Sequence, residues 1–172
     1  MATKFKEAPE VERLIQKLIE KNQEFAVLRD ATIIGRFRFG NWSSRGKVTL
    51  GQAKVLSPFE RHEIGAELAV IVNGEVWDHL DNRQREALVY HELCHFEQMV
   101  DKEGNPKYDD NDRPMFKIIG HDLEEFSAVV RKYGLWMPDT RRFVQAANDG
   151  ERQLSFRIAG SEWKPELEVV GS

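Results

Sequence analysis

The spacing of hydrophobic residues predicts a helix near the start of the chain. From Pro9 to about Asn22 the apolar side chains recur every three or four positions, at Val11, Leu14, Ile15, Leu18 and Ile19. This spacing places them on one face of a helix, and a proline suits the first helical turn. We therefore expect an amphipathic helix over this segment.

Three segments that follow have the pattern of β-strands. Residues 31–40 (ATIIGRFRFG) mix isoleucine and phenylalanine with glycine and arginine, which predicts a strand with one face in water. Residues 46–56 (GKVTLGQAKVL) and 66–73 (AELAVIVN) are two further strand candidates. Glycines and the pair Ser57-Pro58 separate the candidates, as expected of turns.

A second helix is predicted from Asp81 to about Met99. Asp81 can accept a hydrogen bond from the first turn, and Gln84, three residues later, can reach back to complete a capping box. Its apolar residues cover most of the helical circumference (Ala87, Leu88, Val89, Leu93, Phe96 and Val100). We therefore expect this helix to be largely buried.

The rest of the chain is predicted to hold a loop, a short strand and two more helices. Residues 101–114 are polar and rich in Gly, Pro, Asn and Asp, which indicates a loop or a loose hairpin. Residues 115–120 (MFKIIG) fit a short strand. A helix is expected from near His121 to Gly134, and a shorter one over about 139–148.

Length and composition indicate one globular domain over residues 1–172. Apolar residues make up 41% of the chain and charged residues 31%, which is typical of such proteins. The net charge of −4 gives no support for nucleic-acid binding. The first residues contain no long apolar run, so we expect no membrane segment. A single cysteine, Cys94, agrees with a reducing compartment, and we expect a cytoplasmic protein.

The segment His91-Glu92-Leu93-Cys94-His95 has the spacing of a zinc-binding helix. Residues four apart project from the same face of a helix, so His91 and His95 can bind one Zn²⁺ ion. Glu92 lies one position round the helix, where it can take a proton from a water that the metal activates. Buried charges must be paired or bind a metal, so an apolar helix favours the metal interpretation. Glu92 is the expected general base.

A catalytic zinc typically has three protein ligands, so one more must come from elsewhere. We expect it to be His121, which lies 26 positions after His95 and can fold back over the first helix. Glu125, four residues beyond His121, is the alternative ligand, and Asp122 can orient a neighbouring ligand. His62 and His79 are expected at the surface or in loops.

Three other features have simpler interpretations. Cys94 is expected to be a small core residue rather than a ligand or nucleophile. The aspartates at 109, 110 and 112 lack the glycine and terminal glutamate of a calcium loop, so they indicate a solvated turn. The basic residues between 36 and 54 can contact an acidic partner, or simply form the wet face of strands. They are Arg36, Arg38, Arg45, Lys47 and Lys54.

Two blocks of sequence together resemble the phage metallopeptidase family. The first is NGEVWDHLDNRQREALVYHELCHFEQ and the second, after a polar loop, is GHDLEEFSAVVRKYGLW; the likeness covers about residues 30–137. The chain is also similar to the SprT-like zincins, in which a glycine-histidine pair opens a later helix, here Gly120 and His121, with Phe126 following. The resemblance implies a zinc metallopeptidase with ligands His91, His95 and His121 and the base Glu92.

The resulting hypothesis is an α+β, zincin-like protein with a small sheet of three or more strands packed on a buried active-site helix. Its core is expected over about residues 30–137, followed by a helix and tail over 138–172. It would hydrolyse a protein or peptide substrate, which the edge of the strand 66–73 can bind by backbone pairing. The alternatives are a peptidase specific for one repressor protein, and a binding protein in which the metal only fixes the fold.

Overall fold

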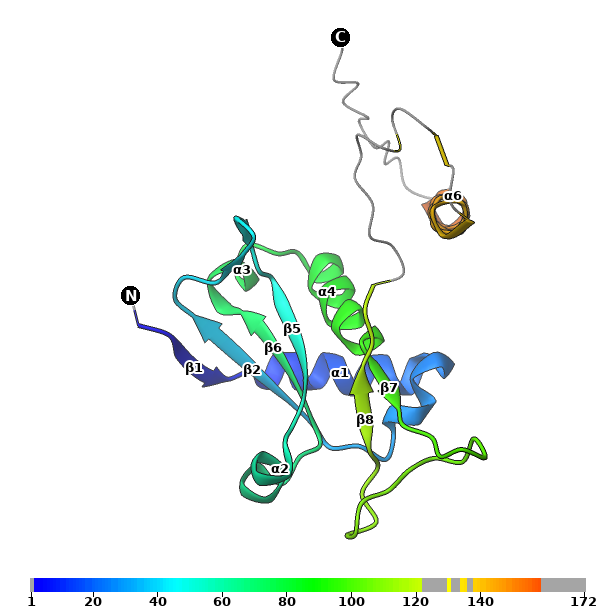
Figure 1. Ribbon diagram of the computed structural model, residues 1–172. Coiled ribbons are helices and arrows are strands. Elements are labelled where there is room, and N and C mark those ends of the chain that lie inside the picture. The colour runs from blue at the N-terminus through cyan, green and yellow to red at the C-terminus, as the bar shows by residue number, and fades with distance from the viewer. Residues whose placement is uncertain (1, 122–129, 131–133, 136–137, 159–172) are drawn as a thin grey trace. The chain divides into compact units, whose positions relative to one another are not determined.

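The computed structural model describes residues 2–121, 130, 134–135 and 138–158 (Figure 1). The contacts within the chain divide it into two units, Met1–Gly120 and His121–Ser172. The expectation of a single domain therefore stays a prediction.

The first unit contains both helices and strands, which confirms the α+β class. The helices are α1 (Pro9–Lys21), α2 (Pro58–Ile64), α3 (Gly74–Trp77) and α4 (Asn82–Cys94), with a 3-10 helix, η1 (Gln23–Leu28), after α1. The strands are β1 (Lys4–Glu7), β2 (Ile33–Phe39), β3 (Ser43–Ser44), β4 (Lys47–Val48), β5 (Gly51–Val55), β6 (Leu68–Asn73), β7 (Phe96–Gln98) and β8 (Phe116–Ile118). The predicted helix at Pro9 and the predicted strand at 66–73 are confirmed.

A mixed four-stranded sheet in the order β1-β2-β6-β5 forms the centre of this unit (Figure 1). Strand β2 is parallel to β6, and the other two pairs are antiparallel. The predicted strand over residues 46–56 is divided, since β4 pairs with β3 in a separate hairpin and β5 joins the sheet. All four residues of strand β1 are exposed, and apolar and polar residues do not alternate along it in the way that marks a half-buried strand. The hydrophobic pattern therefore did not predict it.

The hydrophobic core lies between this sheet and the helices α1 and α4. Ile15 of α1, Val70 of β6 and Leu93 of α4 are all at most 2% exposed. Burying an aliphatic side chain of this size contributes about 1.5–3 kcal/mol relative to leaving it in water. Packing against α1 and the sheet therefore fixes the position of α4, which carries the candidate site.

Helix α4 is shorter and less buried than predicted. Its capping box is confirmed, because Asp81 accepts from the backbone N–H of Gln84 at 2.8 Å and the Gln84 side chain accepts from the backbone N–H of Asp81 at 2.9 Å. The helix nevertheless ends at Cys94 instead of about Met99, and only Val89, Glu92 and Leu93 are buried. The chain leaves the helix because β7 pairs with β8, which buries Phe96 to 6% exposure.

Strand β2 also differs from its prediction of one wet face. Every residue except Gly35 is half-buried, so the two faces do not alternate between buried and exposed. The arginine side chains of this strand contact other side chains instead of extending into water. Arg36 pairs with Glu12 at 3.2 Å, and the Arg38 guanidinium lies 4.4 Å from the centre of the Trp42 ring.

Helix α2 begins where the sequence suggested only a turn. Ser57 caps it by accepting from the backbone N–H of Glu60, whose side chain accepts from the backbone N–H of Ser57. Pro58 occupies the first helical turn. A serine followed three residues later by a glutamate is a helix-start signal, so this helix could have been read from the sequence.

The segment 101–114 is a loose hairpin, as predicted. Isolated bridges join Val100 to Pro106 and Tyr108 to Pro114. Asp109 accepts from the backbone N–H groups of Asn111 and Arg113 at 2.9 and 3.0 Å, so it builds a turn. This agrees with a turn rather than a calcium loop.

In the second unit, α6 (Pro138–Ile158) is longer than the helix predicted over 139–148. The helix expected from near His121 falls mostly outside the described residues. Its predicted end does have the expected form, since Gly134 has a φ of 67° and its N–H donates to the carbonyl of Val130 at 2.8 Å. In the described residues, no helix combines the length and the apolar character that crossing a membrane requires.

Candidate metal centre

The two histidines of the motif lie at the end of α4 and point to the same side. His91 lies in the last turn of α4, and His95 is the residue that follows the helix as its C-cap. The backbone of His95 remains helical (φ −74°, ψ −14°), so the four-residue spacing still places both rings on one face. Their ring centres are 5.1 Å apart. Ending the helix at Cys94 therefore leaves the predicted pair intact.

The orientation of the His95 ring is fixed by the chain after β8. The carbonyl oxygen of Ile119 lies 2.7 Å from Nδ1 of His95, and the N–H of Ile119 donates to the carbonyl of His95 at 2.8 Å. A carbonyl can only accept, so Nδ1 of His95 carries the proton in this hydrogen bond. In the neutral ring the lone pair is then on Nε2, as metal binding through that atom requires.

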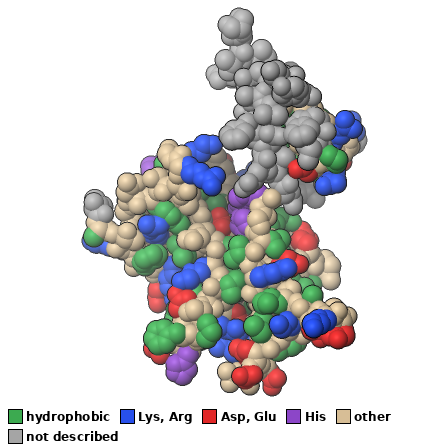
Figure 2. All heavy atoms as spheres, in the orientation of Figure 1, with side chains coloured by type: hydrophobic (Ala, Val, Ile, Leu, Met, Phe, Trp, Pro, Cys, Tyr) green, Lys and Arg blue, Asp and Glu red, His purple; other side chains and the backbone are tan. Residues whose placement is uncertain are grey.

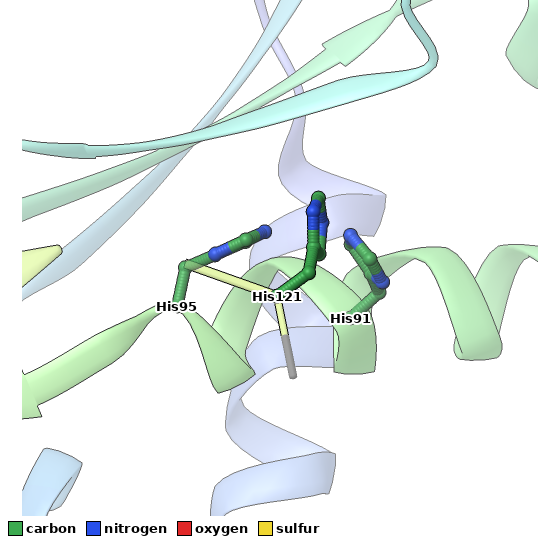
Figure 3. Close-up of side chains that lie close together, drawn as sticks. All are labelled: His91, His95 and His121. Atoms are coloured by element: carbon green, nitrogen blue, oxygen red, sulfur yellow. The ribbon is translucent and has the colours of Figure 1, made fainter. Parts of the chain in front are cut away.

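His121 lies two residues beyond Ile119 and joins the pair. His91, His95 and His121 each offer a ring nitrogen, and these atoms all lie within 4.8 Å of one another (Figure 3). Tetrahedral zinc with bonds of 2.0–2.1 Å separates its nitrogen ligands by about 3.4 Å. His91 and His121 are exposed, and small rotations of their rings can close the difference, so these three residues fit a zinc ion. The role of each as a ligand stays a prediction.

His62 and His79 are not part of this group. His62 lies on α2 with its side chain 85% exposed, and His79 is exposed in the turn after α3. Both agree with the expected surface positions. Asp122 and Glu125 lie outside the described residues, so the structure does not compare Glu125 with His121.

Glu92 is buried beside the histidines, with only 4% of the residue exposed. Burial raises the pKa of its carboxyl, while His95 and the backbone N–H of Ala53 act in the opposite direction. A Cβ atom at Gly51 would lie 2.5 Å from Oε1 of Glu92. Glu92 therefore occupies space that any other residue at position 51 would take.

Comparison with known proteins decides the family. The model of the family described as Putative phage metallopeptidase matches residues 3–148, which is most of the chain. The chain belongs to this family. The match extends beyond the residues 30–137 that carried the resemblance in sequence, and it includes β1 and α1. No curated protein and no solved structure matches the chain.

In this chain, the strand next to the site is β5 and not β6. Strand β6 lies inside the sheet with β2 on one side and β5 on the other, so the predicted use of its edge by a substrate is wrong. Strand β5 is the last strand of the sheet, and Glu92 contacts its first half. The sequence signal that was missed is the glycine at position 51, because glycine in a strand often marks a close approach.

The outer edge of β5 carries backbone groups that are directed away from the sheet. The N–H of Asn73 donates to the carbonyl of Leu50 at 2.8 Å, which fixes the alternation of the antiparallel ladder. Gly51, Ala53 and Val55 then direct their N–H and carbonyl groups away from β6. In agreement with this, the N–H of Ala53 hydrogen-bonds the Glu92 carboxylate.

Cys94 differs from its prediction as a core residue. It is exposed, although it lies between the buried Leu93 and the half-buried His95. Because Val89 and Leu93 face the core, a residue one position further round α4 turns outward.

Proposed function

We propose that this protein is a zinc-dependent peptidase that hydrolyses peptide bonds, with Glu92 as general base. The observation that carries the proposal is the group of three histidine nitrogens beside a buried glutamate. Membership of a metallopeptidase family supports it independently. The single cysteine fits a cytoplasmic site of action.

His91, His95 and His121 would hold the metal, leaving a position open for substrate. A zinc ion bound there would polarise the carbonyl of the scissile bond and lower the pKa of a water molecule. Ile119 keeps the proton of His95 on Nδ1, so Nε2 is available as a ligand atom. Three protein ligands with an open fourth position are typical of catalytic zinc sites, whereas structural sites are closed by four ligands.

Glu92 would move the proton. Its carboxylate accepts a proton from the attacking water and then passes it to the nitrogen of the departing amine. Burial raises the pKa of Glu92, which makes the protonated form easier to reach between these two steps. The backbone N–H of Ala53 would hold the carboxylate at the edge of β5.

The outer edge of β5 would hold the substrate. Among the described strands, only β6 pairs with β5, so the outward-pointing N–H and carbonyl of Gly51 and the carbonyl of Ala53 can pair with an extended peptide. Such a peptide would lie beside Glu92, because the carboxylate contacts these residues. Backbone pairing does not depend on the side chains of the substrate, so this contact alone would accept many sequences.

The test combines metal analysis with hydrolysis of a quenched peptide library. We expect about one zinc per chain, and Glu92→Gln should keep the zinc and lose hydrolysis by roughly 10²-fold or more. His121→Ala should weaken zinc binding strongly, whereas Glu125→Ala should not. Freshly purified protein without metal would overturn the site.

Two results would redirect the proposal. If Glu125→Ala releases the zinc instead of His121→Ala, the third ligand is Glu125. If the wild type contains zinc and cuts no peptide or protein, the metal only fixes the fold. Cleavage of a single repressor protein, with no cleavage in the library, would identify a regulatory peptidase.

A further inference from the structure

Charge is distributed unevenly along this acidic chain. The 172 residues contain 29 acidic and 25 basic side chains. Residues 31–59, however, contain no Asp or Glu, and their basic side chains are Arg36, Arg38, Arg45, Lys47 and Lys54. This segment runs from β2 to the start of α2 and includes β5, the strand that borders Glu92. The candidate site is therefore bordered by a segment that is basic throughout.

Most of these cations have partners in the protein. Arg36 pairs with Glu12, Lys54 pairs with Glu60, and Arg38 stacks on Trp42. Arg45 and Lys47 are exposed, and neither has an ion pair with any residue that the structure describes. Their charge is available to a molecule that binds from outside.

Arg45 and Lys47 lie in one hairpin, residues 42–49, which we call the cationic hairpin. Its strands β3 and β4 pair Ser43 with Val48, and the N–H of Thr49 donates to the carbonyl of Trp42 at 2.9 Å. The chain passes from this hairpin directly into β5. Lys47 is four residues before Gly51, so the Cα atoms of the two residues lie at most about 14 Å apart.

We propose that the cationic hairpin selects substrates with acidic side chains on the C-terminal side of the bond that is cut. This inference rests on the proposed peptidase function and names its substrate class. On the face drawn in Figure 2, Lys and Arg side chains lie near a group of His side chains. Arg45 and Lys47 can form ion pairs with such a substrate, and these pairs steer association.

The side of the cut follows from the direction of β5. This strand starts at Gly51, next to the hairpin, and ends at Val55. Antiparallel pairing is the more stable arrangement, and it makes a bound peptide run from the Val55 end toward the hairpin. With the scissile bond beside Glu92, the residues after the bond pass the cationic hairpin.

Features of the hairpin favour a peptide over a nucleic acid. Single strands of nucleic acid bind basic grooves that also offer aromatic rings for stacking. The aromatic residue of this hairpin is Trp42, and the Arg38 guanidinium covers one of its faces at 4.4 Å. Beside the cations lie exposed aliphatic side chains, Val48 and Leu50, which suit the side chains of a peptide.

The test measures binding separately from hydrolysis. A fluorescent peptide with Asp and Glu residues and its Asn and Gln counterpart are titrated with the zinc-loaded Glu92→Gln protein at low salt. We expect the acidic peptide to bind roughly three- to tenfold more tightly, as two exposed ion pairs would give. High salt should remove the difference.

The decisive variant carries Arg45→Asn and Lys47→Gln in addition to Glu92→Gln. Arg45 has a φ of 50°, a conformation that asparagine tolerates, so the turn should keep its form. We expect this variant to bind both peptides equally. The matched control, Lys21→Gln with Lys102→Gln, removes the same charge elsewhere and should keep the preference for the acidic peptide.

Three results would overturn the inference. They are equal binding of the two peptides by the parent protein, a preference that survives in the hairpin variant, and tighter binding of a single-stranded oligonucleotide of the same charge. In the wild type, acidic residues should raise kcat/KM when they follow the cut bond and not when they precede it; the reverse order would contradict the assigned side. Absence of all hydrolysis would refute the peptidase function. The binding result would still show whether the cationic hairpin prefers acidic peptides.

Discussion

Gly51 lies against Glu92, the proposed general base, and its lack of a side chain leaves room for the carboxylate. A Cβ at this position would lie 2.5 Å from Oε1, 3.0 Å from Cδ and 3.2 Å from Cγ of Glu92. The whole carboxyl group would have to move, and Glu92 has little room because it is 4% exposed. We therefore expect Gly51→Ala to lower kcat/KM roughly 10- to 100-fold while zinc stays bound.

Kinetics together with zinc analysis on the purified variant test this expectation. Gly150→Ala, on α6, is the matched control, because a Cβ there meets nothing within 4 Å. A Gly51→Ala protein with wild-type kinetics would show that Glu92 can act from another position.

At the scale of secondary-structure elements, a buried carboxylate joins α2, the start of β6 and the hairpin 101–114. Glu67 is 3% exposed, and it accepts from the backbone N–H of Thr32 at 2.6 Å and from Nε of Arg113. Arg61 of α2 lies 3.8 Å from the same carboxylate and 3.1 Å from Asp109. These contacts anchor the segment that leads into β8 and on to the histidines.

Glu67→Gln should therefore destabilise the protein by about 3 kcal/mol, because two arginines lose their buried partner. Urea unfolding followed by circular dichroism measures this. Glu97→Gln is the control, since its ion pair with Lys117 is half-exposed and should change stability by less than about 1 kcal/mol. Similar losses for both variants would show that the buried carboxylate is not an anchor.

At the scale of the whole molecule, a metal that binds only the folded protein adds to its stability. At a free zinc concentration of about 1,000 times the Kd, this contribution is about 4 kcal/mol. For a chain of this length, we expect removal of zinc by a chelator to lower Tm by about 10 °C. Calorimetry with and without the chelator measures the shift, and His91→Ala should not respond to the chelator. An unchanged Tm in the wild type would contradict a metal held by the folded chain.

The local sequence determined a large part of this protein. The helix at Pro9, the capping box of α4 and the strand at 66–73 follow from spacings that repeat within a few residues. The pair His91 and His95 also depends only on the geometry of one helical turn, which persists although α4 ends at Cys94. Such features need no knowledge of distant parts of the chain.

Only the tertiary structure decided which distant residues meet. The order β1-β2-β6-β5 makes β5 the edge strand, and the pairing of β7 with β8 ends α4 early. His121 joins His91 and His95, and Gly51 meets Glu92, across gaps of 26 and 41 residues (121 minus 95, and 92 minus 51). A periodic pattern records which face of an element is apolar, but it does not record which partner covers that face. That choice is made by packing of the whole chain.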